Sequence, residues 1–139
     1  MNQRTHQLII STRGKGLYEI TAEVEKWLAG VQGQTGLLTV FCRHSSASLV
    51  IQENADADVR RDMADYFERL VPADTSLYRH TAEGPDDMTS HIRSALTNPS
   101  LTIPLHQGRL ALGTWQGIYL FEHRTAPHRR NVVLHLMYE

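Results

Sequence analysis

The sequence predicts an α+β domain built on a mostly antiparallel β-sheet or sandwich, with about three helices. Apolar residues alternate with polar ones at a period of two over much of the chain. In three other segments the apolar residues recur every three to four positions, as in a helix. Several strand connections are too short for the crossover that parallel strands need. The 139 residues amount to one average domain and show no linker or repeat, so we expect a single domain over residues 1–139.

The N-terminal segments predict strands that flank an amphipathic helix. Residues 6–12 (HQLIIST) form the first strand, a glycine-containing turn follows, and residues 17–20 extend again. Thr21 is the expected N-cap of a helix whose apolar residues recur at helical spacing and which ends at Gly30 and Gly33. These apolar residues are Val24, Trp27, Leu28 and Val31.

Residues 35–43 are apolar on both faces, which predicts a central strand that is buried on both sides. A second strand over 47–52 follows the short link of His44, Ser45 and Ser46. A helix opens at Asp56 and ends before Pro72. Its predicted inner stripe is Val59, Met63, Phe67 and Leu70.

Residues 72–85 have the composition of a loop, and Asp86 with Asp87 opens a third helix that ends at Asn98 and Pro99. The residues expected to point inward from this helix are Met88, Ile92, Ala95 and Leu96. The rest of the chain predicts strands over 100–106, 109–113, 117–124 and 131–138.

Composition narrows the class of protein. The formal charge of −1 provides no positive field for nucleic acid, and no window is apolar enough for a membrane span or a signal peptide. The single cysteine, Cys42, lies in an apolar run and is expected to be a buried thiol. We therefore expect a cytoplasmic protein with neither a nucleic-acid nor a membrane partner.

His44 stands at the end of the apolar strand 35–43, where a histidine can be buried and tuned for catalysis. The hydroxyls and N–H groups of Ser45 and Ser46 could hold an anion beside it. Glu53, at the exit of the next strand, could lie within reach of His44. The alternative is that His44 hydrogen-bonds a neighbouring loop and that Glu53 is structural.

Residues 80–91 contain the richest set of metal-ligand types in the chain. Asp87 and His91 are i and i+4 neighbours on one helical stripe, as expected for a histidine ligand and the carboxylate that orients it. An ordinary helix-capping cluster has the same pattern, and the spacing matches no standard short zinc motif.

The C-terminal part offers a possible ligand surface and a charged strand face. Gly113 and Gly117 permit close approach to Trp115 and Gln116, although glycine turns are common without function. On the strand that follows, Glu122 and Arg124 share a face that needs a partner, a subunit interface or a cleft, while His123 lies on the other face. His135 is expected in the core or at an interface.

Three blocks, HSSASLVIQENAD (44–56), YRHTAEGPDDMTSHIRSAL (78–96) and LHQGRLALGTWQGIYLFEHR (105–124), resemble the signature blocks of the YjbQ-like family. The resemblance covers nearly the whole chain. It implies a β-rich α+β fold, assembly as a homotrimer, and the activity of a secondary thiamine-phosphate synthase. It also places His44, His80 and His91 at a metal or active site; its less certain neighbours are Glu53, Asp87, Gln116, Glu122 and His123.

The reaction implied by the resemblance joins hydroxymethylpyrimidine diphosphate to thiazole phosphate and releases pyrophosphate. For this reaction the resemblance implies that His44, His80 and His91 surround a divalent ion, with Glu53 as a further catalytic group. Histidine ligands favour zinc or another transition metal, whereas pyrophosphate also suits magnesium. The expected substrate-binding residues are Ser45, Ser46, Arg109, Thr114, Trp115, Gln116 and Arg124, and Tyr119 is a second candidate for ring stacking.

Two other functions remain open at this point. One is a histidine-metal hydrolase of a small phosphorylated or acyl metabolite, and the other is a trimer that binds a small phosphorylated metabolite without catalysis.

Overall fold

The computed structural model describes residues 1–139 as two antiparallel sheets that share one core. We call the five-stranded sheet, in the order β1-β8-β3-β5-β6, the large sheet, and the three-stranded sheet, in the order β2-β7-β4, the small sheet. The strands are β1 (Asn2–Thr12), β2 (Gly16–Glu19), β3 (Thr35–Cys42), β4 (Ala47–Glu53), β5 (Ser100–His106), β6 (Arg109–Leu110), β7 (Gln116–Glu122) and β8 (His128–Tyr138).

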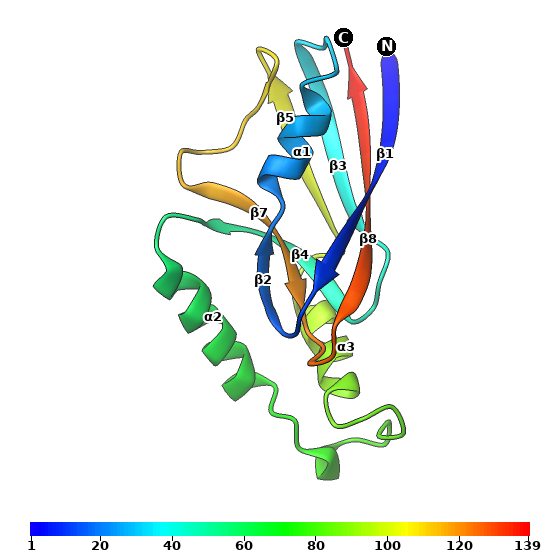
Figure 1. Cartoon of the computed structure of the whole chain (residues 1–139), viewed down its shortest axis with the longest axis vertical. Coiled ribbons are helices and arrows are strands. Elements are labelled where there is room, and N and C mark those ends of the chain that lie inside the picture. The colour runs from blue at the N-terminus through cyan, green and yellow to red at the C-terminus, as the bar shows by residue number, and fades with distance from the viewer.

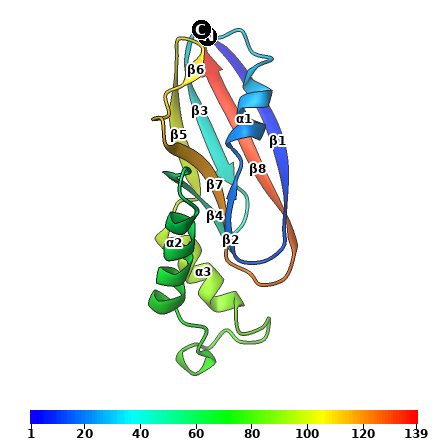
Figure 2. The same cartoon turned by 60° about the vertical axis from the view of Figure 1, so that its left-hand side comes forward.

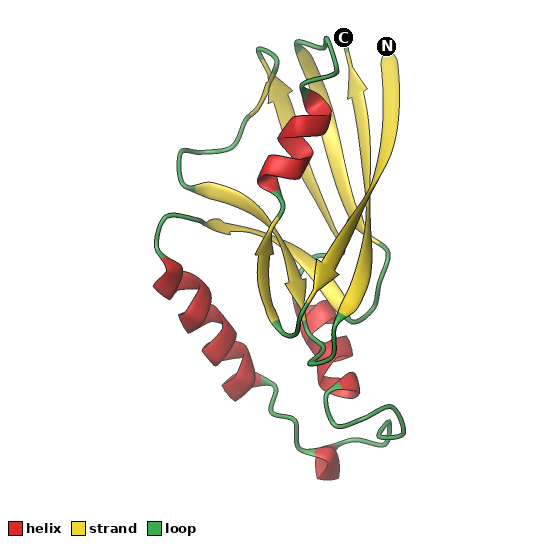
Figure 3. Ribbon diagram, in the orientation of Figure 1, coloured by secondary structure: helices red, strands yellow, loops and turns green.

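The helices are α1 (Thr21–Leu28), α2 (Ala57–Leu70) and α3 (Asp87–Leu96), with a short 3₁₀ turn at Thr75–Leu77. Figures 1 and 2 place α2 and α3 at the end of the molecule away from both chain termini. Figure 3 shows that strands dominate the other end. The α+β class, the antiparallel pairing and the three helices confirm the sequence prediction. No helix combines the length and the apolar character that crossing a bilayer requires.

The core lies between the inner faces of the two sheets and α1. Leu38 and Val40 of β3 pack in one cluster with Leu120 of β7 and Val24 of α1, and all four side chains are fully buried. Trp27, Leu28 and Val31 pack against the edge of this cluster, as the helical spacing predicted. The inner residues of the large sheet thus follow the period of two that alternating strands require.

The other face of the small sheet is covered by α2 and tied to α3. Phe67 of α2 meets the ring of Phe121 edge-on at 5.2 Å between ring centres. The buried Arg93 of α3 donates to Glu68 at 3.0 Å and to the carbonyl of Val71 at 2.8 Å. Parts of the chain distant in sequence therefore hold α3 in a fixed place, which positions the residues at its N-terminus.

Several local predictions were wrong. Thr21 does not cap α1, because its hydroxyl accepts from the N–H of Ile118 and donates to Glu19. Leu96 is 58% exposed, and the buried residues of α3 are polar because they hydrogen-bond the helix backbone and neighbouring segments. They are Asp87, Thr89, Ser90 and Arg93. The strand expected over 109–113 ends at Leu110.

The prediction that β3 is buried on both faces holds for only one of them. The strand is central, between β8 and β5, and its inner residues are buried. Its outer residues Leu37 and Phe41 remain 37% and 46% exposed, because no other element of the chain lies over that face of the large sheet.

Candidate metal centre

The candidate site lies where the N-terminus of α3 meets two turns. His80 and Asp87 come from the approach to α3 and its first residue, and His91 lies one turn further along the helix. Ser45 comes from the β3–β4 turn, and Arg124 from the turn between β7 and β8. Strand pairing brings the two turns to this end of the sheets, because Ala47 lies opposite Glu122.

The three residues that could ligate a metal converge on one point. The Nε2 atoms of His80 and His91 lie 2.6 Å and 3.0 Å from Oδ2 of Asp87, and the candidate ligand atoms of the three residues all lie within 4.8 Å of one another. The side chains of His80 and His91 are 43% and 33% exposed, whereas that of Asp87 is 3% exposed. A buried carboxylate thus anchors two solvent-accessible imidazoles.

The tautomer of His91 is set by the β3–β4 turn. Its Nδ1 lies 2.8 Å from the backbone carbonyl of Ser45, and a carbonyl oxygen can only accept a hydrogen bond. Nδ1 must therefore carry the proton. With Nδ1 protonated, the 3.0 Å contact between Nε2 of His91 and Oδ2 of Asp87 needs either a proton or a cation between the two atoms, and a metal ion bound through Nε2 would take the place of that proton. The donor set fits a divalent transition metal.

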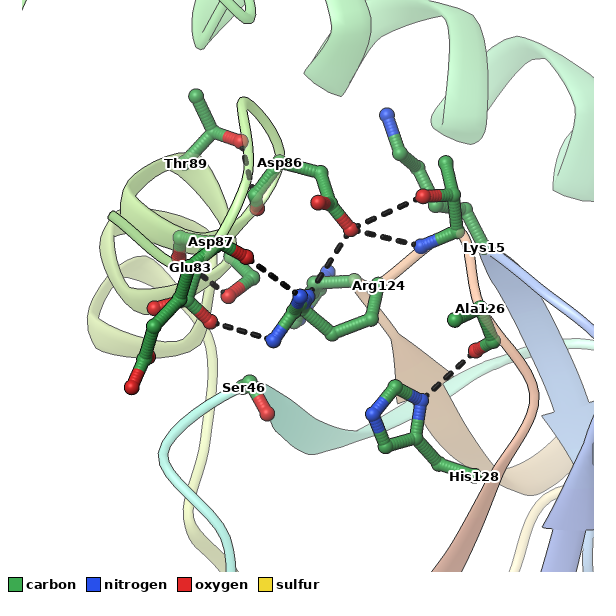
Figure 4. Close-up of polar contacts among 12 residues, drawn as sticks. Lys15, Ser46, Glu83, Asp86, Asp87, Thr89, Arg124, Ala126 and His128 are labelled. Carbon is green, nitrogen blue, oxygen red and sulfur yellow. Dashed lines mark hydrogen bonds and ion pairs between the residues drawn. The ribbon is translucent and has the colours of Figure 1, made fainter. Parts of the chain in front are cut away.

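Arg124 holds the carboxylate of Asp87 in place. Its Nη1 donates to Oδ1 of Asp87 at 2.6 Å, its Nε donates to Asp86 at 2.9 Å, and its Nη2 donates to the carbonyl of Glu83 at 3.1 Å (Figure 4). The three sides of the guanidinium are thereby occupied. Arg124 therefore positions Asp86 and Asp87 in this structure, and phosphate binding by Arg124 stays a prediction.

Asp86 holds Arg124 in its position beside Asp87. Burial alone would raise the pKa of Asp86, but hydrogen bonds from the backbone and hydroxyl of Thr125 and from Arg124 lower it to about 2. Burial opposes the ionisation of Asp87 in the same way, and hydrogen bonding to His80 helps to bring its pKa below the usual range. Both carboxylates are thus ionised at neutral pH. In that form both can pair with Arg124, and Asp87 can also bind a cation.

His44 lies next to Ser45 but does not join the metal-ligand group. Its Nε2 accepts the backbone N–H of Asn131 at 2.8 Å, which is the loop-anchoring alternative that the sequence left open. Burial, followed by the positive charge of Arg130, lowers the pKa of His44. The expected trio of His44, His80 and His91 is replaced by His80, Asp87 and His91, because β8 occupies the acceptor nitrogen of His44.

Glu53 is also separated from the histidines. It is the last residue of β4, whereas the histidine cluster contacts the turn before the first residue, and a strand of this length spans roughly 20 Å. Its Oε2 accepts the N–H of Asp56 at 3.1 Å, close to the start of α2. The expectation that Glu53 lies within reach of His44 was therefore wrong.

The other expected substrate residues divide between two places. The exposed Ser45 and half-buried Ser46 lie in the turn beside the cluster. Arg109, Thr114 and Gln116 line a groove of about 920 Å³ between α1 and the segment after β5, at the opposite end of β7. Trp115 is 61% exposed next to this groove, and Tyr119 is fully buried, so Tyr119 cannot stack on a substrate ring.

Glu122 and His123 are internal rather than ligand-facing. Glu122 is fully buried and accepts from Arg130 and Thr12, so the charged strand face finds its partners within the chain. His123 is 1% exposed, and its Nε2 lies 2.8 Å from the hydroxyl of Ser48. Burial, followed by the charge of Arg93, lowers the pKa of His123 to about 3.

Thr125 is the supporting residue that sequence analysis missed. Its N–H and hydroxyl both bind Asp86, at 2.9 Å and 3.0 Å. No local pattern marks this role, because Thr125 lies in a turn far from Asp86 in the sequence.

Comparison with known proteins gives the family. The family model described as UPF0047 protein YjbQ-like matches residues 6–139. The chain is 53% identical to the UPF0047 protein of Synechocystis sp. over 96% of this chain and 92% of that protein. It is 45% identical to the UPF0047 protein YjbQ of Salmonella typhimurium over 99% of this chain and 98% of the relative.

A solved structure shows the same architecture. The crystal structure of a conserved hypothetical protein from Thermus thermophilus superimposes with a TM-score of 0.83 at 33% identity, covering 95% of this chain and 99% of the other. Sequence blocks, family model and fold agree, and the chain belongs to the UPF0047 family of YjbQ-like proteins.

Proposed function

We propose that this protein is a cytoplasmic, divalent-metal-dependent enzyme that acts on a small phosphorylated metabolite, with His80, Asp87 and His91 as the metal ligands. The observation that carries the proposal is the convergence of His80, Asp87 and His91 on one point, with Nδ1 of His91 held by the Ser45 carbonyl so that Nε2 faces Asp87. Zinc or another transition metal matches this donor set better than magnesium, which prefers oxygen ligands.

A divalent ion at this position would neutralise phosphate oxygens or activate a water molecule. The chain's own residues have separate tasks. Arg124 keeps Asp87 oriented, the Ser45 carbonyl orients His91, and the exposed hydroxyl of Ser45 can donate to a phosphate oxygen. His44, with Nε2 bound to Asn131, is a neutral imidazole whose Nδ1 carries a proton beside the same turn.

The reaction proposed first is the one implied by the family resemblance. The ring nitrogen of thiazole phosphate attacks the methylene carbon of hydroxymethylpyrimidine diphosphate, a C–N bond forms, and the C–O bond to pyrophosphate breaks. Cationic and metal groups accelerate such a step by stabilising the departing pyrophosphate.

Hydrolysis of one phosphorylated substrate is the second candidate, and the separation of the binding residues favours it. Arg109 and Gln116 lie in the groove at the far end of β7 from His91, so within one chain they do not gather around the cluster. Hydrolysis needs one substrate and a water molecule, and His80 and His91 are open to solvent.

We further propose that the protein is a homotrimer, as the resemblance implies. Glu122 gives no support to this assembly, because Thr12 and Arg130 of the same chain satisfy its carboxylate. The support that remains is the uncovered outer face of β3, with Leu37 and Phe41 exposed.

Activity measurements on metal-loaded protein test the proposed function. We expect turnover of hydroxymethylpyrimidine diphosphate, followed as pyrophosphate or phosphate release, to fall at least about 100-fold in His91→Ala, because an inward ligand is lost. The control is His106→Ala, at the exposed end of β5, which should keep full activity.

The dependence on the second substrate separates the reactions. A synthase releases pyrophosphate only when thiazole phosphate is present, whereas a hydrolase acts without it. If His91→Ala retains wild-type turnover while it folds normally, the metal-dependent mechanism is wrong. If the wild type binds these metabolites but turns over none, the protein is a binding protein for them.

A further inference from the structure

Glu83 borders the candidate metal centre and has no task in the function proposed above. Its Oε2 lies 3.6 Å from Nε2 of His80, the same nitrogen that faces Oδ2 of Asp87 at 2.6 Å. Glu83 is not one of the three residues whose candidate ligand atoms all lie within 4.8 Å of one another. A further carboxylate therefore lies at the edge of the point on which His80, Asp87 and His91 converge.

The backbone of Glu83 is held by the same residue that holds Asp87. The carbonyl of Glu83 accepts a hydrogen bond from Nη2 of Arg124 at 3.1 Å, while Nη1 of this guanidinium donates to Asp87 (Figure 4). Gly84 follows with a φ of 104°, a conformation that glycine adopts readily, and its carbonyl accepts the N–H of Asp87 at 3.4 Å. Arg124 and this turn fix the place of Glu83 relative to Asp87.

The side chain of Glu83, in contrast, is free to change its rotamer. It is 67% exposed, whereas that of Asp87 is 3% exposed. Its contact with His80 is also longer than a hydrogen bond. A carboxylate on a fixed backbone can place an oxygen on a metal ion in one rotamer and withdraw it in another.

Three protein ligands leave one position of a tetrahedral metal ion open. Structural zinc sites fill this position with a fourth protein ligand, and catalytic sites fill it with water or substrate. Here the three ligands are two neutral imidazoles and the carboxylate of Asp87, which leave a divalent ion with one uncompensated positive charge. An anionic oxygen is therefore the ligand that suits the fourth position.

We propose that the carboxylate of Glu83 binds the metal ion at this fourth position when no substrate is present, and that a phosphate group of the substrate displaces it. The inference rests on the proposed function. A phosphate group offers anionic oxygens and more negative charge than a carboxylate, so it can compete for the metal. An uncharged metabolite cannot replace the charge that Glu83 withdraws. Glu83 thereby selects phosphorylated substrates.

Calorimetric titration of zinc at neutral pH tests whether Glu83 contributes to the centre. Glu83→Gln should weaken zinc binding about tenfold, because one carboxylate is lost while three ligands stay. The matched control is Glu25→Gln, which removes an exposed carboxylate from α1, away from the centre. This control should leave the zinc affinity within about twofold of the wild type.

Titration of inorganic phosphate into protein loaded with one equivalent of zinc tests the displacement. In the wild type, phosphate must first release Glu83 from the metal, whereas Glu83→Gln has no carboxylate to release. The variant should therefore bind phosphate about tenfold more tightly than the wild type. The gain in phosphate affinity and the loss in zinc affinity should be similar, because one equilibrium between bound and released Glu83 enters both.

Cobalt(II) in place of zinc separates ligation by Glu83 from the effect of a nearby charge. The visible spectrum of cobalt(II) depends on the number and kind of its ligand atoms. The spectra of the wild type and Glu83→Gln should differ without phosphate. They should coincide at saturating phosphate, because Glu83 has then left the metal. Identical spectra before phosphate is added would show that Glu83 does not bind the metal.

The other outcomes separate this inference from the proposed function. A wild type that binds no zinc overturns both. If the wild type binds zinc through His91 and Glu83→Gln binds it equally well, the role of Glu83 alone is wrong. If Glu83→Gln binds zinc more weakly but phosphate no more tightly, Glu83 stays on the metal and its displacement by phosphate is wrong.

Discussion

Replacing Glu122 by Ala should lower the free energy of unfolding by about 3–5 kcal/mol, because it leaves the buried Arg130 without its counter-charge. Glu122 is fully buried and accepts from Thr12 at 2.6 Å and from Nε of Arg130 at 2.8 Å. Its Oε2 also accepts the backbone N–H of His123. One carboxylate thus ties β1, β7 and β8 together. Burial alone would raise the pKa of Glu122, but the hydrogen bonds from Arg130 and Thr12 outweigh burial and lower it.

Urea unfolding at fixed protein concentration measures this loss, since association also contributes to stability. The matched control is the exposed ion pair of Asp58 and Arg61, whose side chains are 70% and 75% exposed. Asp58→Ala should cost at most about 1 kcal/mol. A loss below about 1 kcal/mol in Glu122→Ala would show that the buried carboxylate does not stabilise the fold.

Stability should also fall as the pH drops below about 6.5, and His123 is the main cause. In the unfolded chain its imidazole takes up a proton near pH 6.5, whereas in the folded protein the pKa is lowered to about 3. The unfolded state therefore binds more protons over this window. The contribution is complete above about pH 6.5 and declines by up to about 1.4 kcal/mol per pH unit in acid, or roughly 2 kcal/mol by pH 5.

The variant His123→Gln isolates this effect, because glutamine can still reach the Ser48 hydroxyl but does not titrate. Its unfolding free energy should change less between about pH 7 and pH 5 than that of the wild type. Asp86 and Glu122, whose pKa values are lowered, lose their contributions only in stronger acid. The half-buried His44 adds to the slope in both proteins. Equal slopes for the wild type and His123→Gln would refute the assignment.

Local pattern predicted most elements because each depends on its own residues. The periods of two and of three to four residues identified β3, β4, α1 and α2, and Asp56 caps α2 through the N–H of Asp58, as acidic caps do. The inner face of α3 was not predictable in this way. Arg93 is buried there because Glu68 and Val71, distant in the sequence, accept its hydrogen bonds.

The candidate metal centre also shows that local sequence pattern predicts local contacts but not tertiary ones. The i, i+4 spacing of Asp87 and His91 correctly predicted their contact, because helix geometry is local. The positions of His44 and Arg124 depend on tertiary neighbours, namely the N–H of Asn131 and the carboxylates of Asp86 and Asp87. Glu53 was misplaced because closeness in sequence to His44 becomes distance along the extended β4.

Calorimetric titration of zinc into metal-free protein at neutral pH tests the central claim most directly. His91→Ala and Asp87→Asn should each weaken zinc binding at least about 100-fold, because they remove a ligand or its charge. His44→Ala should leave the affinity within about threefold, because Nε2 of His44 is bound to Asn131 outside the cluster. A wild-type protein that binds no zinc, or a loss in His44→Ala equal to that in His91→Ala, would contradict a metal centre formed by His80, Asp87 and His91.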